Sequence, residues 1–265
     1  MSEPTLRTSG GTPLWIHGTG PLVLLVHGVL MDHRMWAPQV KALAARYTVC
    51  TIDMLGHGRA PDPPGERRLA DFVEQVEEAV ACLADRGAPV LGGFSMGGLV
   101  AQAYAVQNPE KLRGLMVLNA VYDRSPEESA IVRARSRAMR EGGVESAVAS
   151  AESRWFTQAD RTDRAAAVAA IISWMRDGEF GPKAKAHRVF SEGDAEVAGR
   201  LAAVHCPALV MTGDGDAGST PAMARSMGAA LRQARVEILD GQRHMMPYLD
   251  AARVNGVIDE FLASL

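Results

Sequence analysis

The stretch Gly93-Phe94-Ser95-Met96-Gly97-Gly98 follows an apolar run, Val90-Leu91, and precedes a helical stretch, Leu99 to Gln107. It is a G-x-S-x-G pattern between a strand and a helix, where a sharp turn strains the backbone at the central serine. The glycines two residues before and after that serine carry no side chain that could collide in the turn. The pattern predicts that Ser95 presents its hydroxyl as a nucleophile beside a helix N-terminus, which favours negative charge. The alternative is a glycine-rich turn without chemistry.

Short apolar runs alternate with amphipathic stretches of helical length along the chain. The run Leu22 to Val26 is aliphatic throughout, as in a strand buried on both faces of a parallel sheet. The other runs of this character are Thr48 to Ile52, Val90 to Phe94, Leu115 to Leu118, Ala208 to Thr212 and Val236 to Leu239. Apolar residues at three- and four-residue steps from Leu69 to Leu83 indicate a helix packed on a sheet. The alternation predicts an α/β fold, with a mostly parallel sheet and helices on both faces.

The alternation stops between Tyr122 and Arg200. In Ser125-Pro126-Glu127-Glu128 the serine suits an N-cap, the proline the first helical position, and the last glutamate can reach back to the cap. The stretches predicted as helices are Ile131 to Arg140, Val144 to Phe156, Arg164 to Met175 and Lys183 to Phe190. We therefore predict a core made of residues 1–121 and 203–265, with residues 122–202 inserted as a helical cap, or lid.

Length and composition exclude several classes of protein. The chain has 265 residues, 47% of them hydrophobic, which suits one large α/β domain with an insertion rather than a disordered chain. The formal net charge of −3 provides no basic field that could hold nucleic acid or an anionic membrane. We therefore expect a small-molecule partner and neither a nucleic acid nor a membrane, and leave open whether the chain forms a homodimer.

The cysteines and the N-terminal sequence indicate the compartment. Cys50, Cys82 and Cys206 are far apart and form no C-x-x-C pair, so we expect buried, reduced thiols. The first residues lack the basic and apolar regions of a secretory signal. The most apolar run, Leu22 to Val26, is too short to span a bilayer. These features predict a cytoplasmic protein.

A serine hydroxyl needs a base to become a nucleophile. Among the seven histidines, His244 lies just after the last predicted strand, where a loop can lean over the carboxyl edge of the sheet. It is the predicted base, against the alternative of a polar surface histidine. His187 falls in the helical insertion, and His205 precedes a strand, at the wrong end of the sheet. His27 and His57 are expected to hold loop backbone rather than transfer protons.

The base needs an acid that fixes its tautomer and stabilises its charged form. Asp216 follows the strand predicted over Ala208 to Thr212 and is the predicted acid. Asp123, after the strand that ends near Leu118, is a second candidate. Asp214 is expected to be a turn residue that bonds its own backbone.

The oxyanion that forms during acyl transfer needs backbone N–H donors. The Met96 N–H, directly after the serine, is one predicted donor. The second is expected in the loop after the first buried strand, where Gly28 allows the backbone to turn inward. Val29 is the predicted donor there, and Leu30 is the alternative.

The order and rough spacing of these features resemble the α/β-hydrolase superfamily over nearly the whole chain. The matching features are His27-Gly28, the loop from Asp53 to Gly58, the serine turn, Asp216 and His244. Within that superfamily, Ser95-Met96-Gly97-Gly98, the helical cap and Arg154-Trp155-Phe156-Thr157 are similar to 3-oxoadipate enol-lactonases and related small carboxylesterases. The chain departs from the pattern at Arg243, where a small residue usually precedes the histidine, and at Gly58-Arg59-Ala60.

The resemblance implies a serine hydrolase that transfers the acyl group of a carboxylic ester or lactone to water through an acyl-enzyme. That chemistry needs no metal and no cofactor. A serine at position 95 excludes the aspartate-dependent dehalogenases and epoxide hydrolases of the same fold. The alternatives that keep the same triad are a perhydrolase, a C–C bond hydrolase, and a slowly hydrolysing ligand receptor.

Substrate choice depends on the cap. The residues expected to line an apolar substrate pocket are Met31, Trp155, Phe156 and Trp174. The alternative is that they only join the cap to the core. Arg34 or Arg154 could grip a substrate carboxylate bidentately, or each could be a solvated arginine.

Overall fold

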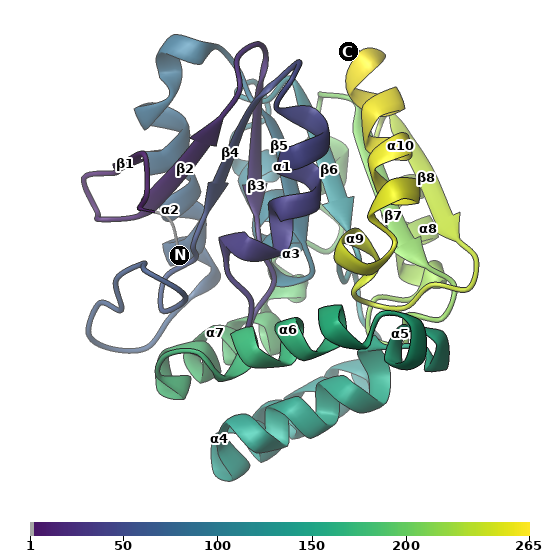
Figure 1. Ribbon diagram of the computed structural model, residues 1–265. Helices are drawn as coiled ribbons and strands as arrows, with labels where there is room; N and C mark the ends of the chain where they lie inside the picture. The colour runs from purple at the N-terminus through teal and green to yellow at the C-terminus, as the bar shows by residue number, and fades with distance from the viewer. Residues whose placement is uncertain (1–2) are drawn as a thin grey trace.

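An eight-stranded sheet runs through the centre of the molecule, whose computed structural model describes residues 3–265 (Figure 1). The strand order is β1-β2-β4-β3-β5-β6-β7-β8. The pairs β1–β2 and β2–β4 are antiparallel, and all the other neighbours are parallel. This confirms the mostly parallel sheet. The strands are β1 (Leu6–Arg7), β2 (Pro13–His17), β3 (Leu22–Val26), β4 (Thr48–Ile52), β5 (Val90–Phe94), β6 (Gly114–Leu118), β7 (Ala208–Gly213) and β8 (Ala234–Leu239).

Burial follows the position of each strand in the sheet. Every residue of β3 to β7 is buried, which explains why these runs are almost entirely aliphatic or small. The edge strand β8 buries only Leu239 fully. The sequence interpretation missed β1 and β2, which lie at the opposite edge. β2 carries Pro13 and the partly exposed pair Ile16-His17, so it lacks the continuous apolar run used to find the others.

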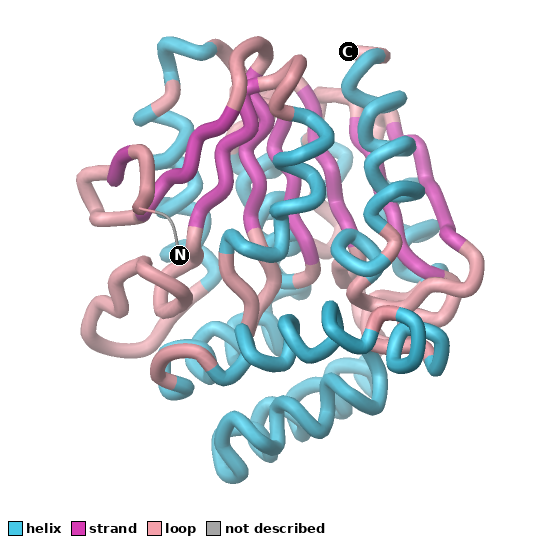
Figure 2. The backbone as a smooth tube through the Cα atoms, in the orientation of Figure 1, coloured by secondary structure: helices cyan, strands magenta, loops and turns pink. Residues whose placement is uncertain are grey.

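Helices cover both faces of the sheet, with α1 and α10 in front of it and α3 and α8 behind it in Figures 1 and 2. The helices of the core are α1 (Ala37–Leu43), α2 (Leu69–Cys82), α3 (Met96–Gln107), α8 (Pro221–Ala230), α9 (Met246–Leu249) and α10 (Ala251–Ala263). Short 3-10 helices are η1 (His33–Trp36), η2 (Ala84–Arg86), η3 (Gly193–Glu196) and η4 (Leu201–Ala203). The cysteines are free thiols, and Cys82, at the end of α2, is exposed rather than buried as expected.

The segment between β6 and β7 forms a layer of helices across one end of the sheet (Figure 1). We call this layer the helical insertion; it contains α4 (Pro126–Trp155), α5 (Gln158–Asp163), α6 (Ala165–Arg176) and α7 (Phe180–Glu192). Ser125 caps α4 as expected, accepting the Glu128 N–H while Glu128 accepts the Ser125 N–H. The two helices predicted over Ile131 to Arg140 and Val144 to Phe156 are both present, and α4 contains them on either side of a kink at Gly143, where φ is 66° and ψ is −160°.

Helix α5 was not predicted, although Thr157 and Asp160 form a capping box at its start. The sequence signal was present, a threonine followed three residues later by an acid, but the helix is short. No helix within residues 3–265 combines the length and the apolar character needed to cross a bilayer.

Chain order reverses direction at β3, whose neighbours are β4 on one side and β5 on the other. In open α/β sheets, ligands bind beyond the carboxyl ends of the strands at such a point. The loop after β3 begins at His27, and the turn after β5 contains Ser95. The helical insertion lies over this same end of the sheet (Figure 1). The fold therefore brings the predicted nucleophile and the predicted oxyanion loop together beneath the insertion.

Candidate active site

Ser95 occupies the sharp turn between β5 and α3. Its φ of 54° and ψ of −115° lie in a region that non-glycine residues rarely adopt. A Cβ on Gly93 would collide with the Gly97 carbonyl, and a Cβ on Gly97 would collide with the Val26 carbonyl. The Ser95 N–H donates to the Leu118 carbonyl of the neighbouring strand over 2.9 Å. The turn is therefore tightly packed, and its strain is held by the sheet on either side.

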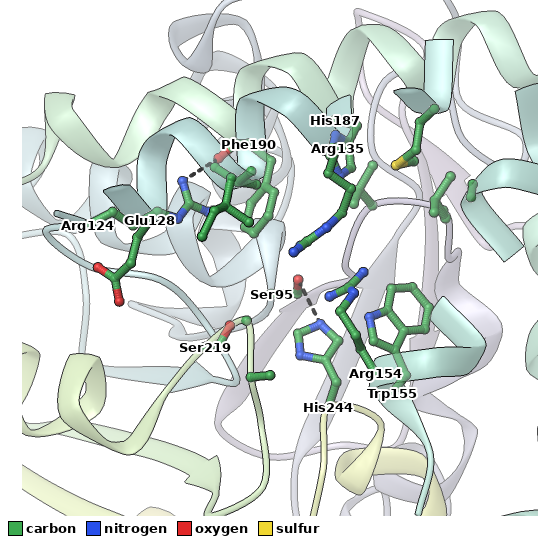
Figure 3. A pocket seen from close by; sticks show the side chains of 18 of the residues that line it. Ser95, Arg124, Glu128, Arg135, Arg154, Trp155, His187, Phe190, Ser219 and His244 are labelled. Carbon is green, nitrogen blue, oxygen red and sulfur yellow. Dashed lines mark hydrogen bonds between the residues drawn. The ribbon is translucent and has the colours of Figure 1, made fainter. Parts of the chain in front are cut away.

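His244 reaches Ser95 from the loop that follows β8. Its Nε2 lies 3.1 Å from the Ser95 Oγ, and both side chains are buried (Figure 3). The imidazole packs against the rings of Phe94 and Trp155, whose centroids lie 4.9 and 5.3 Å from its own. These two contacts restrict rotation of the ring, so its Nε2 stays directed at the serine hydroxyl.

Asp216 lies on the other side of the imidazole, where its Oδ2 is 2.7 Å from the His244 Nδ1. The same oxygen accepts from the Asn119 amide over 2.9 Å. The Oδ1 accepts the backbone N–H groups of Gly218 (2.9 Å) and Ser219 (3.0 Å). Burial alone would raise the pKa of Asp216, but His244, Asn119 and Ser219 together lower it. A carboxylate at this position favours a proton on Nδ1, which leaves Nε2 free to accept the serine proton.

The other acids stand apart from His244. Asp214 is exposed and accepts the N–H of Gln242 over 3.2 Å, a bond across to the loop after β8 rather than to its own backbone as expected. Asp123 is exposed and lies outside the cavity wall that contains Ser95. The sequence interpretation missed Asn119, which directly follows β6 and holds Asp216 in place. Its position at the carboxyl end of a buried strand was a signal that could have found it.

The loop after β3 lies beside Ser95 and contains the two backbone N–H groups considered as oxyanion donors, those of Val29 and Leu30. Gly28 is required there, because a Cβ would lie 2.8 Å from the Phe94 ring and 3.1 Å from the Ser95 Cβ. The Leu30 N–H already donates to the His57 Nε2 over 3.2 Å. The Val29 N–H has no acceptor among residues 3–265, and Val29 lines the cavity beside Ser95. Met96 begins α3, where backbone N–H groups have no partner within the helix.

His27 and His57 bond backbone on both ring nitrogens. The His27 Nδ1 donates to the Gly28 carbonyl and its Nε2 accepts the Met54 N–H, over 2.7 and 2.8 Å. The His57 Nδ1 donates to the Leu55 carbonyl, while its Nε2 accepts from Leu30. Burial lowers the pKa of both imidazoles, so they remain neutral. They join the loops after β3 and β4, and neither bonds Ser95.

A cavity of about 110 Å³ opens beside Ser95 and His244, between the sheet and the helical insertion. Its wall combines the loop after β3, the loop after Asp216, and inward-facing residues of α4 and α7. Of the residues predicted to contact substrate, Trp155 lines this cavity. Among residues 3–265, the cavity wall does not include Met31, Phe156 or Trp174.

The packing of those three residues corrects the prediction. Met31 is 1% exposed and belongs to the hydrophobic core. Phe156 follows the last residue of α4 and is buried beneath the Arg161 guanidinium. Trp174 packs edge-on against Tyr248, with the Arg34 guanidinium over its ring. Trp174 thus joins the insertion to the core, which was the alternative left open, whereas Met31 and Phe156 are buried apart from the cavity wall.

The cavity wall is rich in arginine rather than uniformly apolar. Arg124 is neutralised by Asp194, at 2.9 Å, and both are buried. Arg135 and Arg154 point toward Ser95 in Figure 3, and neither forms an ion pair with a carboxylate within residues 3–265. Burial lowers the pKa of Arg135; burial and Arg135 lower the pKa of Arg154 to about 10, although Asp216 opposes this shift.

Arg34, the other arginine considered for a substrate carboxylate, is already paired. Its guanidinium contacts the carboxylates of Asp32 and Asp177, outside the cavity. Of the two arginines, the structure therefore places only Arg154 at the cavity.

One cluster of potential metal ligands occurs among the described residues, made of Asp32, His33 and Asp53. Its oxygens are already engaged. Asp53 accepts from the His33 backbone and ring and from the Arg59 N–H, while Asp32 is paired with Arg34. These hydrogen bonds show that the cluster links η1 to the loop after β4.

Comparison with known proteins agrees with this architecture. The model of the alpha/beta hydrolase family matches residues 23–257. An (E)-2-((N-methylformamido)methylene)succinate hydrolase of Acinetobacter baylyi is 29% identical over 245 residues, which cover 92% of this chain and 91% of that protein. The 3-oxoadipate enol-lactonase 1 of the same organism is 27% identical, covering 83% and 80% of the two chains.

Among solved structures, an enol-lactonase from Burkholderia xenovorans superposes with a TM-score of 0.87. It covers 98% of this chain and all of its own, at 24% sequence identity. At that identity the likeness concerns the fold, and it confirms the architecture predicted from the sequence.

Proposed function

Because the chain belongs to the alpha/beta hydrolase family, we propose that it is a serine hydrolase that cleaves a carboxylic ester or lactone of a small molecule. The observation that carries the proposal is the continuous hydrogen-bonded line from the Ser95 Oγ through His244 to Asp216, at 3.1 and 2.7 Å. This is the arrangement that a general base needs to activate an alcohol. The names of the two Acinetobacter relatives, a hydrolase and an enol-lactonase, support hydrolysis as the reaction type.

In the proposed first step, the Ser95 Oγ attacks the carbonyl carbon of the substrate while the His244 Nε2 accepts the hydroxyl proton. The carbonyl oxygen becomes an oxyanion, which the N–H groups of Val29 and Met96 stabilise. One such donor contributes about 2.7–4 kcal/mol in the transition state. Asp216 stabilises the imidazolium that forms. The bond to the leaving alkoxide then breaks, and His244 returns the proton to it.

In the second step, His244 removes a proton from a water molecule that attacks the acyl-Ser95 carbonyl. The same donors hold the second oxyanion, and the proton returns to the Ser95 Oγ as the acid departs. The chain thus ends in its starting state, and every proton transfer uses the one imidazole. Held at a fixed orientation by Phe94 and Trp155, the ring needs no large movement between steps.

We further propose that residues 122–202 act as a lid over residues 1–121 and 203–265. The cavity lies where these two parts meet, and Trp155 contributes its ring to both the cavity wall and the packing of His244. A lid at this position would exclude bulk water while the acyl group is bound.

The experiment that tests the proposed function measures turnover of a panel of small acyl esters, lactones and enol-lactones by the wild-type chain and by Ser95→Ala. We expect release of acid from at least one class of substrate, and its loss in the variant without a change in unfolding temperature. Ser226→Ala, an exposed serine on α8, is the matched control and should retain activity. Retained turnover in Ser95→Ala would refute the nucleophile, and no turnover by the wild-type chain across the panel would refute the ester and lactone assignment.

A further inference from the structure

The cavity beside Ser95 holds an excess of positive charge that the chain itself does not neutralise. Arg124 is paired with Asp194. Glu128 also borders the cavity, but its carboxylate accepts the Ser125 N–H, and it lies beside Arg124 at the end away from Ser95 (Figure 3). Arg135 and Arg154 have no carboxylate partner among the described residues, although both guanidinium groups border the cavity.

Two buried polar atoms in the same wall also have no partner. The Nε of Arg154 is buried and makes no hydrogen bond with any described residue. The Nδ1 of His187 also makes no hydrogen bond with any described residue, and His187 is only 5% exposed. Buried polar atoms without hydrogen-bond partners are costly in a native protein and call for an explanation, of which a bound ligand is one.

The kink in α4 brings the two arginines to one place. Arg135 lies before Gly143 and Arg154 lies after it, so a straight helix would carry them far apart along its axis. With the kink, both side chains project toward Ser95 from different sides (Figure 3). A pair of guanidinium groups that converge in this way matches the acceptor geometry of a carboxylate.

We propose that Arg135 and Arg154 bind a carboxylate on the acyl part of the substrate, and we call this pair the carboxylate cradle. The proposal rests on the proposed function, since it assumes that the acyl group is attached to Ser95. We assign the acyl part because the alcohol must leave before water attacks, whereas the acyl part stays beside Ser95.

The size of the cavity limits the acyl part. At about 110 Å³ it is smaller than the cavity of about 150 Å³ that admits benzene in another protein. The cavity therefore favours a short acyl group, and a monoester of succinic acid is the probe for the cradle. Its hydrolysis gives the dicarboxylate, with the new oxygen derived from water, and the cradle should retain this product. Succinate is thus expected to be a competitive inhibitor.

A different use of the same charges would be stabilisation of the oxyanion on the scissile carbonyl. The two uses predict different substrate dependence. Charges that act on the oxyanion accelerate neutral and anionic esters alike, whereas the carboxylate cradle favours only the anionic ones.

The test compares mono-p-nitrophenyl succinate with p-nitrophenyl butyrate, a neutral ester of similar size, in Arg135→Met, Arg154→Met and the wild-type chain. Each variant should lower kcat/KM for the succinate ester by about 10- to 100-fold, the loss expected for a hydrogen bond to a charged group. Activity on the butyrate ester should change by less than about 3-fold, which also shows that the variants are folded. Arg154→Lys should restore part of the loss. Arg137→Met, on the exposed side of the same helix, is the control.

Equal losses on both esters would overturn the carboxylate cradle in favour of a role at the oxyanion or in folding. A second measurement needs no turnover: calorimetric titration of succinate into Ser95→Ala, with and without Arg154→Met. Binding that the arginine substitution weakens supports the cradle even if every ester proves inert, and absence of binding refutes it even if esters are hydrolysed.

Discussion

At the scale of single residues, Ser95 has a strained backbone, and its side chain belongs to a hydrogen-bonded network of side chains. Its positive φ costs about 1–3 kcal/mol, and the hydrogen bond to Leu118 and the glycines around it hold the chain in that state. Asp216, by contrast, has four hydrogen-bond donors, from His244, Asn119, Gly218 and Ser219. The strained turn directs the Ser95 hydroxyl, and the Asp216 carboxylate, which accepts four hydrogen bonds, fixes the orientation of the His244 imidazole.

Replacing Asp216 with asparagine is expected to lower kcat for ester hydrolysis by up to about 10⁴-fold, because an amide favours the wrong tautomer of His244. The shape of the side chain is kept, so the unfolding temperature should change little compared with kcat. Steady-state kinetics on a neutral ester measure the effect. Asp123→Asn serves as the control, since Asp123 is exposed and outside the cavity wall. If Asp123→Asn caused the loss instead, the assignment of the acid would be wrong.

The buried His187 is expected to make the free energy of unfolding depend on pH. Burial, with Arg135, Arg154 and Arg124, lowers the pKa of His187 to about 3. In the unfolded chain the pKa is about 6.5, so as the pH falls below 6.5 only the unfolded state takes up this proton, and stability is lost. This contribution is fully present above pH 6.5 and declines as the pH approaches 3.

The variant His187→Gln removes this proton uptake. The drop in unfolding free energy between pH 7 and pH 5 should therefore be smaller in the variant by roughly 2 kcal/mol. Urea unfolding of both proteins at the two pH values measures it. An equal drop in wild type and variant would mean that His187 is protonated, or exposed, in the folded state.

At the scale of elements, most of the core was predictable because each buried strand is a continuous apolar run. β3 to β7 follow this pattern, and the chain between them supplies helices of ordinary length. β2 was missed because it begins with Pro13 and ends with the less buried Ile16 and His17, so its apolar run is short. The positions of Ser95, Asp216 and His244 were predictable for a similar reason, since each follows a recognisable strand.

The arrangement of the cavity wall was not predictable in this way. Arg135 and Arg154 lie far apart in sequence, and only the kink at Gly143 brings their guanidinium groups together. Trp155 and Phe156 are neighbours in an aromatic motif, yet only Trp155 reaches the cavity, because α4 ends between them. Which residue of such a pair faces substrate depends on where a helix stops, and that position varies by a residue or two in any sequence-based assignment.

The kink gives a prediction about α4. Gly143 has a φ of 66° and ψ of −160°, a conformation essentially confined to glycine. Gly143→Ala should therefore lower the unfolding free energy by about 1–3 kcal/mol, although no atom lies near enough to clash with the new methyl group. The matched control is Gly256→Ala in α10, where the added methyl group also meets open space and the backbone is helical.

In the control, alanine should stabilise the helix by about 0.5–1 kcal/mol. Thermal unfolding of the two variants gives the comparison. Stabilisation by both substitutions would show that residue 143 adopts an ordinary helical conformation and that α4 is straight.

At the scale of the whole molecule, the sheet and the helical insertion share one hydrophobic cluster. Trp155, Ile171 and Phe190 of the insertion belong to the same buried cluster as Phe94 and Leu99 of the core. Ion pairs add to this contact at the surface, where Lys185 and Arg188 of α7 reach Asp62 and Glu66. Exposed pairs of this kind contribute little, so the shared apolar packing is what holds the two parts together.

This packing predicts one cooperative unfolding transition. Hydrogen exchange measured by mass spectrometry across a urea series should give the same midpoint for peptides of α6 and α7 as for peptides of β5 and β6. A lower midpoint for the insertion alone would show that it unfolds as an independent unit.

The central claim is that the Ser95 hydroxyl is made reactive by His244, and covalent labelling tests it most directly. A fluorophosphonate should add one organophosphoryl group to the wild-type chain, with the mass increase on the peptide that contains Ser95. In His244→Ala the rate of labelling should fall by at least about 10³-fold, because the general base is lost. Label on any other residue, or an unchanged rate in His244→Ala, would contradict the account.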